Sequence, residues 1–443
     1  MPDEPSTDIV SPDAFAARLD ALAPSGPASA PARFAIAVSG GRDSMALALL
    51  SRAYAQRTGA WVLALTVDHG LRAGSGAAAR RCAAWCSALG FETRILQWRG
   101  DKPGSGVQAA ARGARYRLLA EACAAHRVDA LMTAHSADDQ AETVFMRLRR
   151  GAGAAGLSAM AEASRIAAGA GAPVRLLRPL LPFSRAQLTA SVRAAGQDFL
   201  DDPANDDPAF ERVRVRALLA ALDEQALLTP AALGRTAARL RDADRRLRAA
   251  EARLFDRLGG CFHGWGGVSL DRADAAAPDM GGLAARLIHA ASGEAHPPGA
   301  DEAFNALAAA CGTGAATLAG ALIRTARGRV WFLREPAALL GRSGVAPAPS
   351  APLTGPTLWD GRFILRPLDQ EKAFAVEPLG RNLASLGARR ALLAAPAAGA
   401  AGTPAIYCDG ALIGVAGASF GRVTRFACEA LAQERFAGEI IRF

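Results

Sequence analysis

Four short apolar runs separated by helix-forming segments constrain this chain more than any other feature of its sequence. The runs cover residues 34–38, 61–68, 91–98 and 128–134, and each is rich in Val, Ile, Leu or aromatic residues and bounded by turn formers. Strands that alternate with helices in this way form parallel sheets, because each crossover helix returns the chain to the same edge. We therefore predict an α/β fold in which helices cover both faces of a parallel sheet.

The 443 residues are enough for roughly two to four domains. Helices rich in arginine are predicted at 210–222 and 231–258, two β-like runs flank the turn at 326–328, and further strands are predicted at 362–365 and 405–408. The expected organisation is a tail and helix (1–32), the α/β domain (33–222), a mainly helical region (223–344), a Pro/Ala linker (345–356) and a small α+β domain (357–443).

The charge balance favours a polyanionic partner. Lys and Arg total 51 against 42 Asp and Glu, a formal charge of +9, which suits nucleic acid first and anionic lipid second. The lysines are only Lys102 and Lys372, so the placement of the arginines matters more than their number. No secretory leader and no uninterrupted run of ~20 apolar residues is found, so we expect no membrane span and a cytoplasmic protein. The sequence leaves the oligomeric state open, a homodimer included.

The seven cysteines form an odd set without a Cys-x-x-Cys pair. This count disfavours a disulfide framework, a zinc ribbon and an iron–sulfur site. Cys82 and Cys86 lie one helical turn apart, with no nearby pair of histidines. We expect both to be packing residues.

The segment Ser39-Gly-Gly-Arg-Asp-Ser44 joins the first predicted strand to a helix. Such a turn brings free backbone N–H groups and the positive end of a helix dipole together, which makes an anion site. Gly40 and Gly41 would adopt positive φ and admit phosphate oxygens, and Ser39 and Ser44 would add hydroxyl donors. The alternative is a plain turn with Asp43 capping the helix. A Walker A loop is excluded because it needs a lysine.

Thr133-Ala-His-Ser-Ala-Asp-Asp-Gln-Ala-Glu-Thr143 follows the fourth predicted strand. If a helix begins near residue 135, one face carries His135, Asp138, Asp139 and Glu142. That much negative charge favours a bound cation, either Mg²⁺ or a cationic amine. The alternative is that the aspartates favour the helix dipole and Glu142 is solvated. The position at the carboxyl end of a parallel strand favours a ligand site.

Three further segments have two interpretations each. Asp68-His69-Gly70-Leu-Arg72 would face the base and ribose of a nucleotide, or simply end the second strand at Gly70. Arg112 and Arg115 share a helix face and would reach phosphate, or be solvated. Gly151, Gly153 and Gly156 match a dinucleotide fingerprint but follow a helix, so we expect a flexible basic loop at 149–156 instead.

The segment 39–44 resembles the signature of PP-loop ATP pyrophosphatases, which split ATP between its α and β phosphates. Together with the segments 68–72, 108–116 and 133–143, and with Arg149-Arg-Gly-Ala-Gly153, Arg178-Pro-Leu-Leu181 and Asp201-Asp-Pro-Ala-Asn205, it resembles the bacterial tRNA(Ile)-lysidine synthetases. The resemblance covers roughly residues 33–222, about half the chain. Two positions depart from it: Ser136 stands where the family usually has a second histidine, and Val213 stands where an asparagine would follow Arg212.

The resemblance implies a ligase that uses ATP and Mg²⁺ to attach L-lysine to cytidine 34 of tRNA(Ile) with a CAU anticodon. It implies that residues Ser39, Gly40, Gly41, Arg42, Asp43, Ser44, Asp68 and His69 bind ATP. Asp43 and Asp139 would bind the metal, and Asp138, Asp43 and Arg112 would be catalytic. The substrates would contact His135, Asp138, Asp139, Glu142 and Arg149. The rivals are a tRNA 2-thiolase, an amide synthetase acting on a small molecule and a non-catalytic RNA-binding protein.

Overall fold

The chain divides into two compact units in the computed structural model. The first comprises Met1–Ile166 and Pro173–Leu247, and the second comprises Ala167–Ala172 and Arg248–Phe443. The residues that the structure describes are 9–23, 32–72, 74–100, 102–167, 173–201, 207–271, 280–341, 351–353, 357–369, 372–380, 386, 396–408, 410–416, 418–419, 426–438 and 440–442. Most of the predicted linker, and residues 202–205 of the predicted turn at 200–205, lie outside these ranges.

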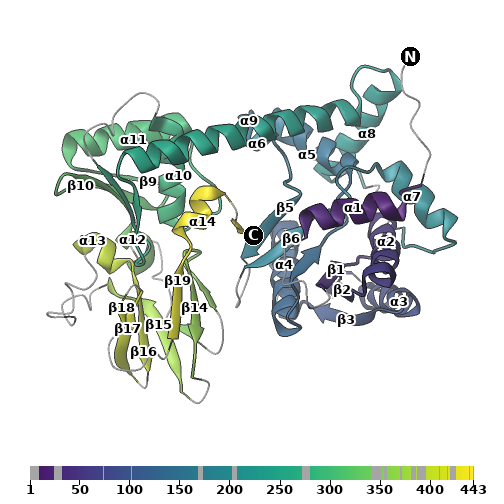
Figure 1. Ribbon diagram of the computed structural model, residues 1–443, viewed down its shortest axis with the longest axis horizontal. Helices are drawn as coiled ribbons and strands as arrows, with labels where there is room; N and C mark the ends of the chain where they lie inside the picture. Colours follow the sequence, from purple (N-terminus) through teal and green to yellow (C-terminus); the bar gives the residue numbers. More distant parts are fainter. Residues whose placement is uncertain are drawn as a thin grey trace. The chain divides into compact units, whose positions relative to one another are not determined.

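Helices and strands alternate through the first unit (Figure 1). Its elements are α1 (Pro12–Leu22), β1 (Arg33–Ala37), α2 (Arg42–Thr58), β2 (Trp61–Asp68), α3 (Ser75–Ala88), β3 (Glu92–Gln97), α4 (Val107–Ala125), β4 (Ala130–Met132), α5 (Ala137–Arg149), α6 (Ala154–Leu157), β5 (Ala163–Ala167), β6 (Val174–Leu177), α7 (Arg185–Ala194) and α8 (Glu211–Glu224), followed by α9 (Pro230–Arg257), which continues into the second unit.

The sheet of the first unit has the strand order β5-β6-β4-β1-β2-β3. Strands β6, β4, β1, β2 and β3 are parallel, which confirms the prediction, and the four predicted strands are all present. The sequence did not predict β5 and β6, and β5 adds an antiparallel pairing with β6. After β1 the chain forms β2 on one side of β1. After β4, which lies on the other side of β1, the chain forms β6 beyond β4. A crevice therefore opens between the carboxyl ends of β1 and β4, which is where open α/β sheets bind ligands.

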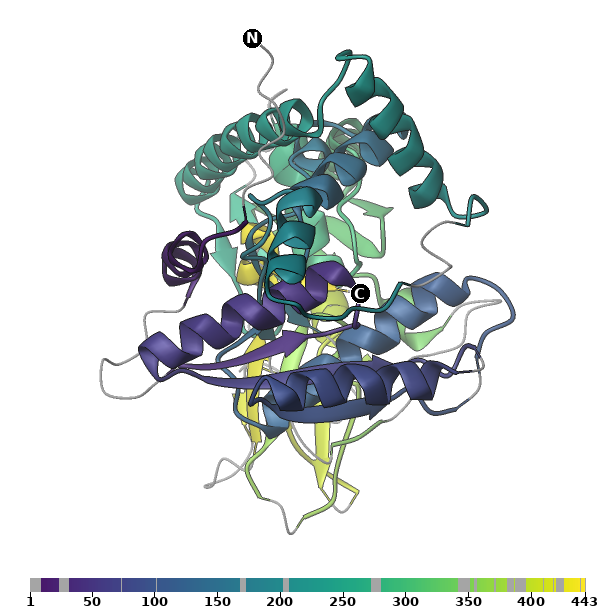
Figure 2. The same ribbon diagram turned by 90° about the vertical axis from the view of Figure 1, so that its right-hand side faces the viewer.

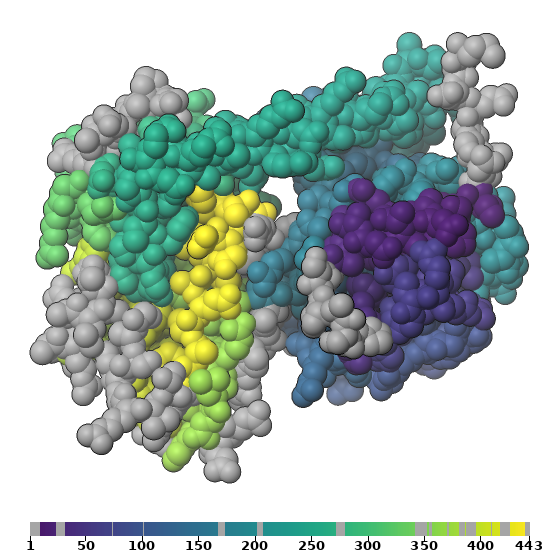
Figure 3. Space-filling model, viewed as in Figure 1, coloured from purple at the N-terminus to yellow at the C-terminus, as the bar shows by residue number. Residues whose placement is uncertain are grey.

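Helices lie on both faces of this sheet, as the alternation predicts. Figures 1 and 2 show α2 and α3 on one face, with α4 on the other. Helices α1 and α7 pack against α2, and α1 lies on the surface beside it in Figure 3. The core beneath these helices includes Phe34, Ile36, Met45 and Leu47, all completely buried. Burial of each such side chain stabilises the fold by roughly 1.5–3 kcal/mol.

Cys82 and Cys86 are buried in the same core, which confirms that they are packing residues. The Sγ atom of Cys82 accepts a hydrogen bond of 3.3 Å from the Thr66 hydroxyl on β2. A helix therefore packs against the sheet here through two thiols, as the one-turn spacing indicates.

The second unit contains three sheets as well as helices. Its elements are β7 (Cys261–Phe262), β8 (Val268–Asp271), α10 (Met280–Ser292), α11 (Ala300–Thr313), β9 (Ala315–Leu318), β10 (Ala321–Ala326), β11 (Arg329–Arg334), α12 (Pro336–Leu340), β12 (Ala351–Pro352), β13 (Thr357–Trp359), β14 (Phe363–Pro367), β15 (Phe374–Pro378), α13 (Ala397–Ala401), β16 (Pro404–Cys408), β17 (Ala411–Val415), β18 (Ala418–Ser419), β19 (Phe426–Ala430), α14 (Ala432–Ala437) and β20 (Ile440–Arg442).

The arginine-rich helices, the hairpin of β10 and β11, and strands β14 and β16 are confirmed. The region 223–344 is mainly helical by length, but its helices α10 and α11 pack on a five-stranded sheet, β7-β8-β11-β10-β9, which the sequence did not predict. The boundaries chosen at 222 and 357 stay predictions. None of the helices in the described part of the chain is both long and apolar enough to cross a membrane.

Candidate functional site

The loop between β1 and α2, here called the glycine loop (Ser39–Ser44), has the geometry of an anion-binding turn. Gly40 has φ +85°, and Gly41 is the N-cap of α2 with φ −70° and no side-chain cap. The first N–H groups of α2 therefore have no partner within the helix and lie at the positive end of its dipole. The positive φ predicted for Gly40 is confirmed, whereas that predicted for Gly41 is wrong because Gly41 already continues as extended backbone.

The side chains of the glycine loop brace the loop itself. The Ser44 hydroxyl donates to the Gly41 carbonyl at 2.8 Å and accepts from the Ser39 N–H at 3.2 Å. Ser44 is only 5% exposed and its hydroxyl hydrogen is directed to Gly41, so ATP contact by Ser44 stays a prediction. Arg42 lies over the Phe199 ring and pairs with Asp201 at 3.3 Å, on the segment that covers the loop.

We expect different effects when each of the two glycines is replaced by alanine. A Cβ on Gly40 would lie 2.6 Å from the Leu200 side chain at a positive φ, whereas a Cβ on Gly41 meets only the Ser39 hydroxyl at 3.7 Å. We expect Gly40→Ala to lower the free energy of unfolding by about 2 kcal/mol. Gly41→Ala should leave stability unchanged but weaken ATP binding, because its methyl group lies beside the free N–H groups. Urea unfolding and nucleotide titration of both variants check this, and equal stabilities would contradict it.

Helix α5 begins at Ala137 rather than near residue 135. Ser136 is its N-cap: the Asp139 carboxylate accepts from the Ser136 N–H at 2.9 Å, and the Ser136 hydroxyl accepts from the Asp139 N–H, forming a capping box. The prediction that His135 shares a helix face with the carboxylates is therefore wrong, because His135 precedes the N-cap and lies outside the helix. Ser136, the departure from the family pattern, has a structural role here.

Asp138, Asp139 and Glu142 do gather at the start of α5, and the cations that compensate them come from the chain itself. The backbone N–H of Arg185, the first residue of α7, donates to Asp138 Oδ2 at 2.7 Å. The Arg185 guanidinium lies 3.2 Å from Asp139 Oδ1 and 3.3 Å from Glu142 Oε1. Its Nε lies 3.5 Å from Asp43 Oδ2 in the glycine loop. Burial alone would lower the pKa of Arg185, but these carboxylates outweigh burial and raise it.

Two arginines of α8 pair with the acidic cluster, which consists of Asp138, Asp139 and Glu142. Arg212 pairs with Glu142 and lies 2.9 Å from Asp139 Oδ1, and Arg216 lies 2.9 Å from Glu142. The Glu142 side chain is 2% exposed and contacts three arginines. In this structure Glu142 is a buried counter-ion enclosed by guanidinium groups of the chain, and its contact with a substrate stays a prediction.

Four arginines beside this cluster lie near His135: Arg112, Arg115, Arg178 and Arg212. The His135 ring is partly buried, with Nδ1 3.0 Å from the Thr133 hydroxyl. Burial, and then Arg178, Arg115, Arg212 and Arg112, hold the pKa of His135 well below its usual value. The imidazole is therefore neutral at pH 7. Arg112 is one of these four arginines, and burial, Arg115 and Arg212 lower the pKa of its guanidinium. Carboxylates and guanidinium groups thus meet at the carboxyl ends of β1 and β4.

The sequence matches known proteins along the whole of this site. The PP-loop domain model matches residues 13–222. The tRNA(Ile)-lysidine synthase of Methylobacterium sp. is 41% identical over 312 residues, 68% of this chain and 88% of that protein. The chain belongs to the tRNA(Ile)-lysidine synthase family. The enzyme of the same name from Bradyrhizobium sp. is 48% identical over 223 residues, which span 50% of this chain and 60% of that protein.

Similarity to solved structures is more limited than similarity to these sequences. The U34-tRNA thiolase NcsA from Methanococcus maripaludis aligns with a TM-score of 0.43 and 16% identity, over 52% of this chain and 78% of that one. So partial a match carries no argument about function. The lysidine synthase family membership rests on the sequence matches, and the PP-loop match includes every residue of the glycine loop and the acidic cluster.

The glycine loop of this lysidine synthase family member offers one oxygen suited to a cation. Burial, together with Asp139, raises the pKa of Asp43 to about 6, although Arg185 lowers it. Asp43 Oδ1 is buried and has no hydrogen-bond partner in the structure. Among the described residues no three His, Cys, Asp or Glu side chains form a metal cluster. Mg²⁺ needs only one or two carboxylates besides phosphates and water, so Asp43 with Asp139 fits such an ion.

The remaining predicted site residues lie farther along the same edge of the sheet or on the surface. Asp68 ends β2 and accepts from the Gly70 N–H at 3.0 Å, so the strand-ending turn is present. His69 lies edge-on to Trp98, and burial and Arg115 lower its pKa. Arg149 is exposed and pairs with Glu211. ATP contact by Asp68 and His69 and substrate contact by Arg149 stay predictions.

The predicted flexible loop at 149–156 is instead held in place. It contains the one-turn helix α6, and the Arg147 guanidinium donates to the carbonyls of Gly156 and Ala159. The amide of Gln140 exchanges two hydrogen bonds with the backbone of Met160 just beyond. The prediction of a flexible loop missed these bonds because the side chains that make them, Arg147 and Gln140, lie on α5, outside the loop.

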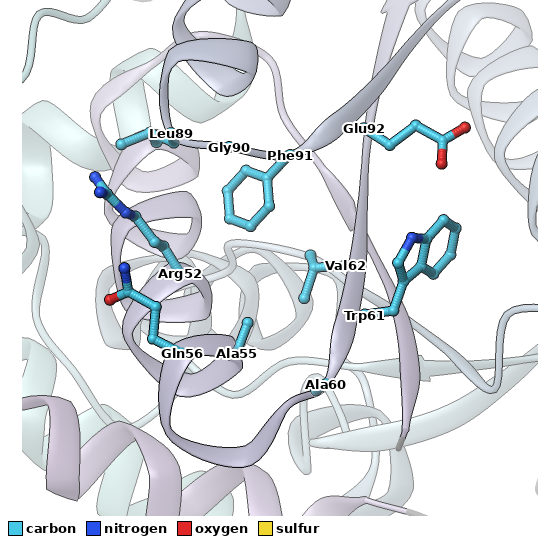
Figure 4. Close-up of a pocket in the computed structure, with 10 residues that line it drawn as sticks. All are labelled: Arg52, Ala55, Gln56, Ala60, Trp61, Val62, Leu89, Gly90, Phe91 and Glu92. Carbon is cyan, nitrogen blue, oxygen red and sulfur yellow. The ribbon is translucent and has the colours of Figure 1, made fainter. Parts of the chain in front are cut away.

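A pocket of about 430 Å³ lies at the opposite edge of the sheet (Figure 4). Trp61 and Glu92, the first residues of β2 and β3, line it, and Phe91 points into it. Because ligands of parallel sheets bind at the carboxyl ends of strands, this pocket is separate from the crevice that holds the acidic cluster.

Sequence reasoning missed Arg185 and Arg216 and noted Arg212 only as a neighbour of Val213. One signal for Arg185 exists in the sequence. Ser184-x-x-Gln187 predicts a helix that begins at Arg185, and a cation at the first position of a helix opposes its dipole. Such a local conflict marks a residue that is placed for another reason.

Proposed function

We propose that this protein joins L-lysine to C2 of cytidine 34 in tRNA(Ile) with a CAU anticodon, consuming ATP and releasing AMP and pyrophosphate. One observation carries the proposal: the amino ends of α2, α5 and α7 converge at one crevice, where Arg185 joins Asp43 to Asp139. The uncapped N–H groups at the amino end of α2 form a site for a polyanion. The carboxylates beside them suit the amine of a second substrate.

In the first step the cytidine O2 attacks the α phosphorus of ATP, and the bond to the β phosphate oxygen breaks. The N–H groups of the glycine loop would receive the charge that develops on the departing pyrophosphate, and Arg112 would stabilise the phosphate oxygens. Fixed donors of this kind lower barriers by several kcal/mol in enzymes generally. Mg²⁺, held by Asp43 and Asp139, would neutralise phosphate charge when bound.

In the second step the lysine ε-amine attacks C2, loses a proton, and AMP leaves. An ammonium is not nucleophilic, so a base has to take a proton from it first. Asp138 is suited to this role because its Oδ2 is fixed by the Arg185 N–H at 2.7 Å and Asp138 itself is only partly buried. The buried Glu142 is less suited because three arginines already neutralise it.

The tRNA would be held mainly by arginine contacts to phosphate, with α9 as a source of them: Arg239, Arg246 and Arg253 are exposed on this helix. We expect the affinity for tRNA(Ile) to fall about 10³-fold between about 50 and 200 mM salt, which corresponds to roughly six phosphate contacts. Filter binding across this range measures the slope. A flat response would remove phosphate contacts as the basis of tRNA binding.

The decisive test of the reaction is mass analysis of the anticodon nucleoside. Purified protein, tRNA(Ile) transcript, ATP, Mg²⁺ and lysine should yield lysidine at position 34, and AMP should appear in equal amount. Omitting lysine should stop the reaction at the adenylated tRNA. Elongator methionine tRNA is the matched control, because it also has a CAU anticodon. Absence of a modified nucleoside with all components present would overturn the proposal.

Two rival functions make different predictions in the same assay. A 2-thiolase would require a sulfur donor, whereas Cys82, which lies beside Gly40, and Cys86 are buried in the core. A non-catalytic RNA-binding protein would bind tRNA and ATP without releasing AMP. A cytoplasmic location and a homodimer accompany the proposal as expectations.

A further inference from the structure

One guanidinium group meets the carboxylates of two separate segments. Arg185 contacts Asp43 in the glycine loop through Nε, and Asp139 and Glu142 on α5 through its two terminal nitrogens. Its backbone N–H meets Asp138 as well. The Arg185 side chain is 17% exposed, so these contacts are shielded from solvent. They connect the loop after β1 to the helix after β4, the two walls of the crevice.

Local effects disfavour a charged arginine at position 185, so the tertiary contacts determine its placement. Arg185 is the first residue of α7, where the helix dipole disfavours a cation. Burial also disfavours its charged form. The four carboxylates outweigh both effects, and removal of the guanidinium would leave them to repel one another across the crevice.

We propose that Arg185 is a positioning residue for the ATP-dependent step. It keeps Asp43 of the glycine loop at a constant separation from Asp139 and orients Asp138, so that phosphate and amine sites stay in register. This inference rests on the proposed function for the identity of the step. Arg185 itself contacts carboxylates in the structure rather than a reacting atom.

The planar fork of arginine matters for this role. Its three nitrogens face three carboxylates in different directions, whereas the ammonium of lysine is a single point that reaches fewer of them at once. Glutamine keeps a donor but removes the charge. We therefore expect kcat and binding of the ATP analogue to fall in the order arginine, lysine, glutamine at position 185.

The experiment compares Arg185→Lys and Arg185→Gln with Arg193→Gln in the full chain. Arg193 lies on the same helix and is exposed, so it provides a matched loss of charge. We measure kcat and KM for ATP in tRNA-dependent AMP release, binding of α,β-methylene-ATP with Mg²⁺, tRNA affinity and melting temperature. We expect Arg185→Gln to lower kcat about 100-fold, as a misplacement of ~1 Å does, and to weaken analogue binding about tenfold.

Arg185→Lys should recover part of both losses, and tRNA affinity should stay within twofold for every variant. The proposal is overturned if Arg185→Gln matches Arg193→Gln in kcat, KM and analogue binding. It is also overturned if the losses follow only the fraction of folded protein, with lysine no better than glutamine. If Arg185→Gln does not fold, Arg185→Lys alone decides, and wild-type kcat would then reject the role. If the wild-type protein releases no AMP, the proposed function fails, while analogue binding still decides the role of Arg185.

Discussion

Replacement of Asp138 by asparagine will lower lysidine formation about 10³-fold and leave tRNA affinity within twofold of wild type. The amide oxygen of asparagine still accepts the hydrogen bond that the Arg185 N–H donates to Asp138 Oδ2 at 2.7 Å, so the start of α7 keeps its partner. The amide cannot take a proton from the lysine ammonium, and loss of a general base typically costs 10²–10⁴-fold. Quantitative mass analysis of position 34 under single-turnover conditions measures the effect.

A control and a second readout make this prediction specific. Asp223 is exposed near the end of α8, so Asp223→Asn makes the same chemical change away from the crevice and should leave the rate unchanged. The adenylated tRNA should accumulate in Asp138→Asn, because cytidine O2 attacks phosphorus without using this carboxylate. Turnover at the wild-type rate would refute the assignment of Asp138, and loss of the adenylated intermediate would assign it to the first step instead.

Replacement of Glu142 by alanine will produce the largest loss of stability among the site variants. Its carboxylate is 2% exposed and neutralises Arg185, Arg212 and Arg216. Removing one partner of a buried ion pair typically costs about 3–5 kcal/mol, because the remaining charges stay buried without compensation. For a unit of this size that corresponds to a fall in melting temperature of roughly 10 °C. Thermal unfolding followed by circular dichroism measures it.

The matched control for Glu142 is a glutamate that is far more accessible to solvent and also has two arginine partners. Glu211 pairs with Arg149 and Arg150 at the surface, where solvent screens the interaction. Glu211→Ala should therefore leave the melting temperature unchanged. Equal melting temperatures for Glu142→Ala and wild type would show that Glu142 does not stabilise the arginines. Glu142→Gln, which keeps an acceptor oxygen, should lie between the two.

The parts of the fold that depend on neighbouring residues could be predicted from the sequence. The strands at 33–37, 61–68 and 130–132 were recognisable because a buried parallel strand is a continuous apolar run. The largely exposed strand at 92–97 was recognisable from its Ile and Leu and the flanking aromatic residues between turn formers. The glycine loop was recognisable because a strand, two glycines and a helix start are adjacent in the chain. The antiparallel strand β5 was missed because its pattern, Ala163–Ala167, carries no clear alternation.

The partners of the acidic cluster could not be predicted from residues that are adjacent along the chain. A helix that begins at 137 instead of 135 removes His135 from the predicted face, and this depends on one hydroxyl, that of Ser136, capping the helix. The cationic partner that the carboxylates require was expected to be a metal or a substrate amine. Three arginines of the chain supply most of it, and they lie more than forty positions from Glu142 along the sequence.

The sequence by itself determined the α/β class, the anion-binding turn, the positions of the carboxylates and the family of the protein. Each of these follows from short-range chemistry: periodicity, turn residues and capping act over a few neighbours. Only the tertiary structure decided that Asp43, Asp139 and Arg185 meet, because the order of β4 beside β1 brings segments far apart in the chain to one crevice. The same packing made Glu142 a buried counter-ion, since a charge's role depends on which distant side chains exclude water from it.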